Sequence, residues 1–378
     1  MKRAGRATGR AWIELDMNNL RYNVNLVRER LPGACQIMAS VKANAYGHGA
    51  VGFCRELNNL GVRAFCVASV LEGLELRKGH IEGEILVLGY THPDRFRLLE
   101  KYGLTQTVLD LEYAELLNGF GEKLAVHVKI DTGLRRLGER SENMDRIIRI
   151  FKCRNLVITG IYTHLRAEND GETENIFTKG QIECFQDVCA EIGRRGLDLP
   201  KSHIQNSYGF LNHPDLVYDY VRIGRVLYGT LNEPRDAEKY GVKLRPVLSL
   251  KTRIGAVKTV SAGEYIGYGF TFAASKEMKI AVLAIGYADG LPRSLSHGAG
   301  HALINGQKAP VLGDVCMDQT MVDVTNIENA ERGDIAVIIG KSGEAETTAY
   351  DVAVQAGTIS SEVLSRLGGR LERIFAIL

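Results

Sequence analysis

The sequence predicts an α/β protein in which a (β/α)8 TIM-type barrel is followed by a mainly antiparallel β domain. Three observations support this prediction. The chain has 378 residues, short apolar runs alternate with amphipathic segments over its first two thirds, and this alternation stops near residue 240. A chain of this length exceeds one ordinary hydrophobic core, so two domains are expected. We assign residues 1–240 to the barrel and residues 241–378 to the β domain.

The first part of the chain contains eight apolar runs of strand length. These predicted strands are 35–42, 64–69, 84–90, 104–110, 125–131, 156–164, 202–207 and 220–224. Amphipathic segments between most of them predict helices at 48–60, 71–78, 111–118, 142–151 and 174–195. Regular alternation of eight strands with helices is typical of a closed parallel barrel.

After residue 240 strand-like segments follow one another through turns. They are 247–260, 278–286, 302–304, 309–312, 320–324 and 335–339. The pair Asn305-Gly306 is a strong hairpin signal between two of them. Two short helical stretches at 348–356 and 360–367 and an apolar end at 374–378 complete the predicted β domain.

Composition excludes several classes of function. A formal net charge of +2 gives no electrostatic case for binding nucleic acid or a membrane surface. No apolar run approaches the roughly 18 residues of a membrane span, and the basic segment 1–10 lacks the apolar stretch of a secretory signal. Seven cysteines without a C-x-x-C pair indicate reduced thiols and a cytoplasmic protein. No histidine pair has metal-ligand spacing, so no metal site is assigned.

The segment 41–49 is the most informative part of the chain. Lys42 follows an apolar stretch, 37–40, that is predicted to be a buried strand, and the glycines after it predict a turn. A lysine at the exit of a buried strand is costly unless it has a function, because burial disfavours its charge. Such a lysine is suited to act as a Schiff-base nucleophile.

Unusual polar residues lie at the carboxyl ends of five predicted strands, where the active sites of barrels are found. They are Lys42, Asp131 with the segment 132–136, His164, Asn206 with Ser207, and Arg222 with Gly224. Barrels often bind phosphate with the loops after their last two strands. The Ser207 hydroxyl and the amides of Gly224 and Arg225 are suited to this, and Tyr46 offers a phenol. The alternative is that Ser207 and Gly224 are ordinary turn residues.

Taken together, these segments resemble the motifs of bacterial alanine racemases over nearly the whole chain. The matching segments, in the family's order and spacing, are 41–49, 129–138, 160–164, 203–207, 222–229, 268–269, 286–290 and 313–319. The resemblance implies a pyridoxal-phosphate-dependent homodimer with active sites shared between subunits. It also implies interconversion of L- and D-alanine, a small amino-acid substrate, for the precursors of cell-wall peptidoglycan.

The resemblance implies a role for each matching residue. Lys42 matches the lysine that forms a Schiff base with the cofactor and moves the α-proton on one face, and Tyr268 matches the base on the opposite face. The matches to cofactor-binding residues are Tyr46, His164, Asn206, Ser207, Arg222, Gly224 and Arg225, with Arg222 facing the pyridine nitrogen. The matches to substrate-binding residues are Arg136, Tyr287 and Met317, and the family takes Tyr268 and Met317 from the partner subunit.

The chemistry of racemisation explains these residue types. One base cannot easily reach both faces of Cα, so two are required. An arginine cannot accept a proton, so Arg222 should leave the pyridine nitrogen neutral. The alternative for Arg222 is a structural salt bridge at the barrel mouth.

Lys129 shares one face of its predicted strand with His127 and Asp131, and that face is expected to point into the barrel. An uncompensated charged lysine there would be costly. The family carries a CO2-carbamylated lysine at this position, so we expect Lys129 to be carbamylated and to orient Arg136. The alternative is an ordinary ion pair of Lys129 with Asp131 or a glutamate.

The sequence departs from the family at Ser361, where most alanine racemases carry a tyrosine that narrows the pocket entrance. A serine leaves more space there. The serine racemase domains of vancomycin resistance, which are fused to membrane segments, also lack this tyrosine. L-serine racemisation is therefore an alternative to alanine racemisation, and neutral drift with water in the gap is another explanation of Ser361.

Two further alternatives share the lysine at position 42. A barrel-type pyridoxal-phosphate amino-acid decarboxylase would leave Tyr268 and the motif 316–318 unexplained, and it should carry an acidic group near the pyridine nitrogen. A non-catalytic carrier of pyridoxal phosphate would need neither Tyr268 nor the long β domain.

Overall fold

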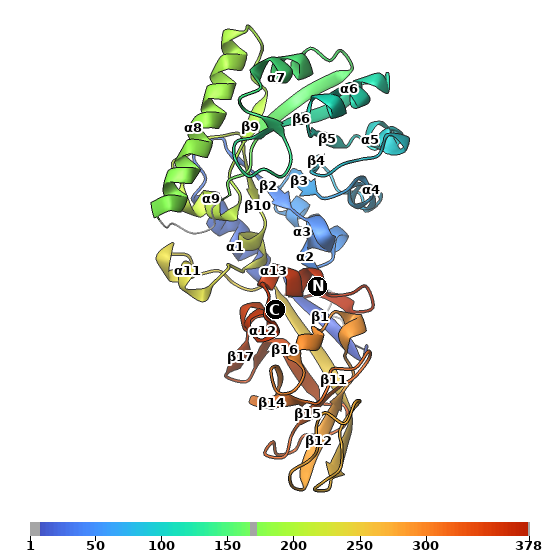
Figure 1. Cartoon of the computed structure of the whole chain (residues 1–378). Coiled ribbons are helices and arrows are strands. Elements are labelled where there is room, and N and C mark those ends of the chain that lie inside the picture. Colours follow the sequence, from blue (N-terminus) through green and yellow to red (C-terminus); the bar gives the residue numbers. More distant parts are fainter. Residues whose placement is uncertain (1–7, 167–171, 377–378) are drawn as a thin grey trace. The chain divides into compact units, whose positions relative to one another are not determined.

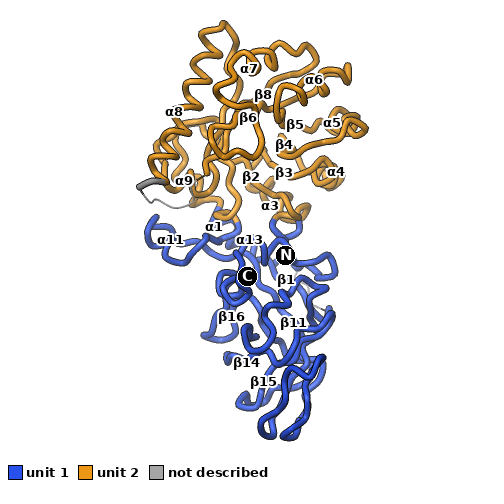
Figure 2. The backbone as a smooth tube through the Cα atoms, in the orientation of Figure 1, with its two compact units in different colours: residues 1–23, 46–49, 228–378 blue, residues 24–45, 50–227 orange. Residues whose placement is uncertain are grey.

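The structure is a computed structural model that describes residues 8–166 and 172–376. It divides into two compact units, each assembled from more than one segment of the chain (Figure 2). Of the described residues, unit 1 contains 8–23, 46–49 and 228–376, and unit 2 contains 24–45, 50–166 and 172–227. Among the described residues, no helix is both long and apolar enough to cross a membrane.

Unit 2 is built on a parallel sheet with the strand order β10-β2-β3-β4-β5-β6-β8-β9 (Figure 1). These strands are β2 (Gln36–Ser40), β3 (Ala64–Val67), β4 (Glu84–Val87), β5 (Thr105–Val108), β6 (Leu124–Asp131), β8 (Leu156–Tyr162), β9 (Lys201–His203) and β10 (Tyr220–Ile223). The short β7 (Glu139–Arg140) pairs with β6 off this path.

The two ends of this strand order are joined by backbone hydrogen bonds. Asp219 N donates to Ser202 O at 3.0 Å, and Arg222 N donates to Gln205 O at 3.0 Å. The sheet therefore nearly closes on itself as a parallel barrel, and the predicted (β/α)8 fold is confirmed.

Helices follow most of the barrel strands. They are α1 (Met17–Glu29), α2 (Lys42–Tyr46), α3 (Ala50–Asn59), α4 (Val70–Lys78), η1 (Pro93–Arg95), α5 (Phe96–Lys101), α6 (Leu111–Gly119), α7 (Met144–Phe151), α8 (Glu172–Arg194), α9 (Ser207–Asn212) and α10 (Arg225–Tyr228). Local sequence fixes their starts, because Ser69 and Asp110 accept backbone hydrogen bonds as N-caps of α4 and α6. The amphipathic α7 buries three isoleucines, as its periodicity predicts.

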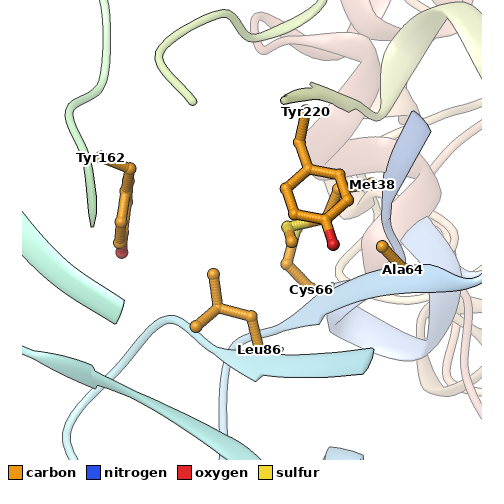
Figure 3. Packing of buried hydrophobic residues seen from close by; sticks show 6 residues of the cluster. All are labelled: Met38, Ala64, Cys66, Leu86, Tyr162 and Tyr220. Atoms are coloured by element: carbon orange, nitrogen blue, oxygen red, sulfur yellow. The ribbon is translucent and has the colours of Figure 1, made fainter. Parts of the chain in front are cut away.

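The inside of the barrel is filled by side chains from several strands. Figure 3 shows a buried cluster from five of them: Met38, Ala64, Cys66, Leu86, Tyr162 and Tyr220. Every residue of β3, β5 and β10 is buried, because a barrel strand faces the interior on one side and helices on the other.

Unit 1 is a mainly antiparallel sheet. Its strands are β1 (Ala11–Asp16), β11 (Leu248–Val260), β12 (Met278–Leu283), β13 (His301–Ile304), β14 (Gln307–Leu312), β15 (Thr320–Asp323), β16 (Ile335–Ser342), β17 (Ala345–Thr347) and β18 (Glu372–Ala376). The short helices are α11 (Pro234–Lys239), η2 (Tyr287–Asp289), η3 (Arg293–Leu295), α12 (Ala349–Ala356) and α13 (Ser360–Ser365). The long β11 pairs with both β12 and β16, which closes β11, β12, β15, β14, β13 and β16 into a ring.

In unit 1 the structure agrees with the sequence-based prediction at one hairpin and adds one strand to it. The hairpin predicted at Asn305-Gly306 is confirmed, because both residues have positive φ (47° and 76°) and they join β13 to β14. The strand β1 was not predicted. It lies between β11 and β18 in the sheet of unit 1, antiparallel to the former and parallel to the latter.

Candidate active site

Lys42 is separated from β2 by one residue, at the carboxyl end of the barrel, and the α2 segment that it begins is a left-handed turn rather than a regular helix. Ala43, Asn44, Ala45 and Tyr46 have φ between 49° and 54°. A residue with a side chain disfavours this conformation by about 1–2 kcal/mol. Backbone strain of this kind concentrates at functional sites, where the surroundings hold it in place.

Specific hydrogen bonds hold this turn. Val41 N donates to Cys66 O at 2.9 Å, and the Asn44 side chain accepts from Ala50 N at 2.7 Å. The carboxylate of Glu72 accepts from Ala43 N at 2.8 Å and from Ala68 N at 2.6 Å. The residue next to Lys42 is therefore tied to the first turn of α4.

Arg222, in β10, is 5 % exposed and is held by several partners. Its guanidinium donates to the carbonyls of Thr163 (2.7 Å), Ile204 (3.0 Å) and His203 (3.1 Å). It also lies 5.0 Å from the centre of the Tyr162 ring. Burial lowers the pKa of Arg222. Among the described residues no carboxylate pairs with this guanidinium, so the expected alternative of a salt bridge at the barrel mouth is not found.

His164 is partly buried just beyond the end of β8. Burial and the positive charges of Arg222, Arg136 and Lys129 lower the pKa of His164 well below its ordinary value. Its Nδ1 lies 3.3 Å from an Arg222 nitrogen, which can only donate. His164 is therefore neutral at pH 7 and carries its proton on Nε2.

The ends of β9 and β10 bring together the residues predicted to bind phosphate. Asn206 caps α9 by accepting from Gly209 N at 2.8 Å. The Ser207 hydroxyl accepts from Gly224 N at 3.2 Å. Arg225 Nη1 is buried and has no hydrogen-bond partner among the described residues. The Gly224 amide already donates to Ser207, so the Ser207 hydroxyl proton and the unpartnered Arg225 nitrogen are the donors suited to an anion.

Lys129 is 5 % exposed and points into the barrel, as the alternation of its strand predicted. Burial and the charges of Arg136 and Arg222 lower the pKa of Lys129 to about 8. Asp131 accepts from the backbone of Gly133 at 2.9 Å and pairs with Arg135 at 3.6 Å rather than with Lys129. The expected alternative of a Lys129–Asp131 ion pair is therefore not found. Arg136 is exposed at the same end of β6.

Unit 1 contains a cavity of about 930 Å³ that brings together three residues singled out from the sequence. Tyr268, Tyr287 and Met317 line it, and they are 73 %, 42 % and 53 % exposed. Tyr268 lies between two glycines with positive φ, Gly267 (81°) and Gly269 (74°), which turn the backbone sharply on both sides of it.

A close backbone approach joins the segments that carry Tyr287 and Met317. Tyr287 N donates to Cys316 O and Ala288 N donates to Met317 O, both at 3.0 Å. A Cβ atom on Gly286 would lie 2.3 Å from Cys316 O, so only glycine fits there. The two sequence motifs at 286–290 and 313–319 thus form one wall of the cavity.

A buried carboxylate that the sequence analysis missed anchors this wall. Asp289 is fully buried and accepts from Gly286 N at 3.0 Å. It also pairs with Arg10 at 2.7 Å and with Arg370 at 3.5 Å. Arg370 in turn pairs with Asp318 at 2.6 Å. The only available signal was the position of Asp289 inside the motif 286–290, because its partners are remote in sequence.

The predicted site residues fall into two groups, one in each unit. Those in unit 2 lie at the ends of barrel strands and are Lys42, Lys129, Arg136, His164, Asn206, Ser207, Arg222, Gly224 and Arg225. Those in unit 1 are Tyr46, Tyr268, Tyr287 and Met317. The Tyr46 ring packs against Tyr228, with ring centres 4.9 Å apart.

Two family models match the chain. They are described as "Alanine racemase, N-terminal domain", over residues 15–232, and "Alanine racemase, C-terminal domain", over residues 247–375.

Curated relatives match nearly all of the chain. An amino-acid racemase of Enterococcus faecalis is 42 % identical over 368 residues, which cover 97 % of this chain and 52 % of that protein. A serine/alanine racemase of Enterococcus gallinarum is 38 % identical, with 96 % and 51 % covered. The chain thus spans about half the length of these relatives. An alanine racemase of Carboxydothermus hydrogenoformans is 39 % identical, with 96 % and 99 % covered.

Solved structures share the fold throughout. The alanine racemase of Clostridium difficile 630 superposes with a TM-score of 0.92 at 34 % identity and covers 98 % of this chain and 97 % of its own. The alanine racemase of Bartonella henselae, described with covalently bound pyridoxal phosphate, has a TM-score of 0.84 at 27 % identity, with 97 % and 100 % covered.

Proposed function

This chain belongs to the alanine racemase family, and on that premise we propose that it is a pyridoxal-phosphate-dependent racemase of L- and D-alanine. The observation that carries the proposal is the donor set at the barrel rim. Lys42 lies there with a buried arginine that has no carboxylate partner among the described residues, and the Ser207 hydroxyl and an unpartnered Arg225 nitrogen are suited to phosphate.

The chemistry of these donors fits the cofactor. Lys42 would hold its aldehyde, Arg222 would face the pyridine nitrogen, and Ser207, Gly224 and Arg225 would hold the phosphate, with Asn206 and Tyr46 in support. Pyridoxal phosphate, when bound, supplies an electron sink for negative charge on the substrate Cα. Arg222 can only donate, so it would leave the pyridine nitrogen without a proton. This arrangement differs from that of a decarboxylase with an acidic group at that nitrogen.

Two groups of this protein would move the proton. Lys42 Nζ would take or return it on one face of Cα, and Tyr268 Oη would do so on the other, because one base cannot serve both faces. Arg136 would hold the substrate carboxylate, and Tyr287 and Met317 would line the pocket. His164, being neutral, would contribute a hydrogen bond from Nε2 rather than a charge.

We further propose that the protein is a homodimer in which the second base is Tyr268 of the partner subunit. The support is the exposure of the aromatic loop around it. Tyr265 is 57 % exposed and Phe270 is 78 % exposed, and their rings contact each other at 5.1 Å between centres. Exposed aromatic groups of this size mark interaction surfaces.

Carbamylation of Lys129 remains our proposal. A lysine whose pKa is lowered to about 8 is partly uncharged near neutral pH. The free amine adds to CO2 and releases one proton. This reaction replaces a buried cation with a carbamate anion. That anion would pair with Arg136 and orient it. An intact-mass measurement in bicarbonate should show the added mass of one CO2, and its absence would reject the modification.

Racemisation of L-serine is the second candidate function. Two observations favour it: Ser361 stands in α13 where the family carries a tyrosine, and one relative is named a serine/alanine racemase. The seven cysteines are free thiols, which supports a reducing cytoplasm. A role in supplying D-amino acid to peptidoglycan precursors follows from the proposed alanine racemase activity.

One assay tests both candidates. Purified protein is incubated with pyridoxal phosphate and with L-alanine or L-serine, and the D-enantiomer is measured for wild type and Ser361→Tyr. We expect a yellow enzyme, borohydride labelling at Lys42, and an alanine-to-serine ratio that rises in the variant. A colourless, unlabelled and inactive protein would refute the racemase proposal, and equal ratios would remove Ser361 from the specificity.

A further inference from the structure

A chain of polar contacts crosses the interior of the barrel beneath Arg222. An Arg222 nitrogen lies 2.6 Å from His203 Nδ1, and His203 Nε2 lies 2.9 Å from His127 Nδ1. His127 Nε2 then lies 2.7 Å from Glu84 Oε1. The four residues come from β10, β9, β6 and β4. None of the roles assigned above uses His127, His203 or Glu84.

The two ends of this series of polar contacts, Arg222 and Glu84, differ in their environment. His127 and His203 are fully buried, and the His203 ring stacks on Tyr162 at 4.7 Å between centres. Glu84 is the first residue of β4, on the side of the barrel opposite the strand ends that carry the site, and its side chain is 19 % exposed. The contacts therefore connect a partly solvated carboxylate to the buried guanidinium.

Only one arrangement of protons satisfies all three contacts with neutral imidazoles. The guanidinium can only donate, so His203 Nδ1 accepts and the His203 proton lies on Nε2. That proton points to His127 Nδ1, so the proton of a neutral His127 lies on Nε2, the nitrogen that is 2.7 Å from Glu84 Oε1. Burial, with the charge of Arg222, lowers the pKa of His203 well below its ordinary value, which agrees with a neutral ring.

Glu84 is suited to be the charged end of the chain. Burial disfavours its charge, but contact with His127, a hydrogen bond from Tyr220 and the charge of Lys201 together lower the pKa of Glu84. The Tyr220 hydroxyl donates to its second oxygen at 2.9 Å, and Lys201 donates to that hydroxyl at 2.8 Å. Glu84 Oε2 therefore accepts a hydrogen bond, while Oε1 lies at ion-pair distance, 2.7 Å, from His127 Nε2.

A buried guanidinium needs compensation, and among the described residues no carboxylate contacts Arg222. In this proton arrangement the lone pair of His203 faces Arg222, the lone pair of His127 faces His203, and His127 Nε2 is the ring nitrogen nearest to Glu84. We propose that Glu84 is the remote counter-ion of Arg222, and that His127 and His203 are positioning residues that transmit its effect across the barrel. The inference rests on the proposed function only where it concerns the cofactor.

The first test needs no cofactor. Protein labelled with ¹⁵N in its histidine rings is compared with Glu84→Gln by NMR. Tyr220→Phe is one control, because it removes a neighbouring hydroxyl but keeps the carboxylate. Glu82→Gln is the other, because Glu82 is an exposed carboxylate two residues away that pairs with Arg63 at 3.7 Å.

We expect two buried imidazoles with protons fixed on Nε2 in the wild type and in both controls. Glu84→Gln should shift both sets of ring signals, because the partner at the end of the chain has lost its charge. A wild type with either proton on Nδ1, or a folded Glu84→Gln with unchanged ring signals, would overturn the proposal. If Glu84→Gln does not fold, Glu84→Asp keeps the charge but moves it away from His127, so a smaller shift of both sets of ring signals is expected, and unchanged ring signals in a folded Glu84→Asp would overturn the proposal.

The second test uses the protein loaded with pyridoxal phosphate. Glu84→Gln should move the absorption band of the bound cofactor and lower kcat on the order of tenfold, with a smaller change in KM. Glu82→Gln should match the wild type in both. If Glu84→Gln alters the histidine ring signals but leaves the cofactor absorption band and kcat unchanged, the series of contacts from Glu84 to Arg222 serves only packing. That result would overturn the counter-ion role. A wild type that binds no cofactor would defeat the proposed function, while the NMR comparison would still decide the proton arrangement.

Discussion

The barrel rim of unit 2 and the cavity of unit 1 hold their functional side chains in opposite ways. Arg222, Lys129 and Ser207 at the rim are buried, and Arg222 and Ser207 are fixed by hydrogen bonds from neighbouring strands. Tyr268 and Met317 in the cavity are exposed and are positioned through the backbone that carries them. The rim is organised by contacts within unit 2, whereas the cavity of unit 1 leaves its side chains exposed. This contrast is in keeping with the active site shared between two subunits that we propose.

The largest expected effect is at Lys42, on the rim. Lys42→Ala should lower racemisation on the order of a thousandfold or more, because both the covalent attachment of the cofactor and one proton transfer would be lost. Turnover of L-alanine and borohydride labelling measure the two losses. Labelling of another lysine at the wild-type level would contradict the assignment.

Tyr268→Phe tests the cavity side of the comparison. We expect racemisation to fall roughly a hundredfold or more, because a general base contributes about that much. The absorption of bound cofactor should stay the same, since the rim is intact. Tyr265→Phe, in the same exposed loop, is the matched control. Normal rates in both directions with Tyr268→Phe would refute the two-base mechanism.

Asp289→Asn should weaken the ion pairs that anchor the wall of the cavity in unit 1, without changing the barrel rim of unit 2. Removing the charge of a buried carboxylate paired with two arginines costs about 3 kcal/mol of stability. Chemical denaturation should therefore show a lower unfolding midpoint, and the KM for alanine should rise. Asp318→Asn, at the exposed end of the same network, should do much less. Equal effects of the two substitutions would show that Asp289 is not the anchor.

The stability of the rim should depend on pH through Lys129. Its pKa is lowered from 10.5 to about 8 in the folded protein. Between these two values the unfolded chain holds a proton that the folded chain has lost, so stability rises with pH, by up to about 1.4 kcal/mol per pH unit. Below pH 8 both states are protonated and this contribution is constant. Denaturation in CO2-free buffer should show the slope in wild type and not in Lys129→Met.

The smallest expected effect is at Glu72, which ties the turn after Lys42 to α4. Glu72→Gln leaves one of two backbone amides without its acceptor, at a cost of about 1–2 kcal/mol. We expect a few-fold decrease in kcat and a slightly lower unfolding midpoint. Glu75→Gln, on the exposed side of the same helix, is the control. A decrease shared by both variants would indicate a general effect on α4.

The sequence predicts most of the secondary structure of the barrel and the residues that lie at the ends of its strands. The strands and helices of the barrel follow from periodicity, and Lys42, His164, Ser207 and Arg222 could be placed at one rim because a parallel barrel puts all carboxyl strand ends together. The inward direction of Lys129 followed from simple alternation along β6.

The sequence does not reveal contacts that form only when the barrel closes, or contacts between residues that are far apart in the chain. The approach of Glu84, His127 and His203 to Arg222 exists only once eight strands have closed, and nothing near any of these residues signals the others. The same holds for Asp289, whose partners Arg10 and Arg370 lie near the two ends of the chain. The left-handed turn at 43–46 was also hidden, because alanine and asparagine do not by themselves signal it.

The position of β1 has a consequence for biosynthesis. A ribosome releases this apolar strand before the barrel strands of this chain, yet its two neighbours, β11 and β18, begin only at residues 248 and 372. Glu14 of β1 meets Lys251 of β11 across 237 positions. The barrel can therefore begin to fold while β1 still has two unpaired edges, and a fragment ending before residue 248 would keep that strand as an aggregation-prone tail.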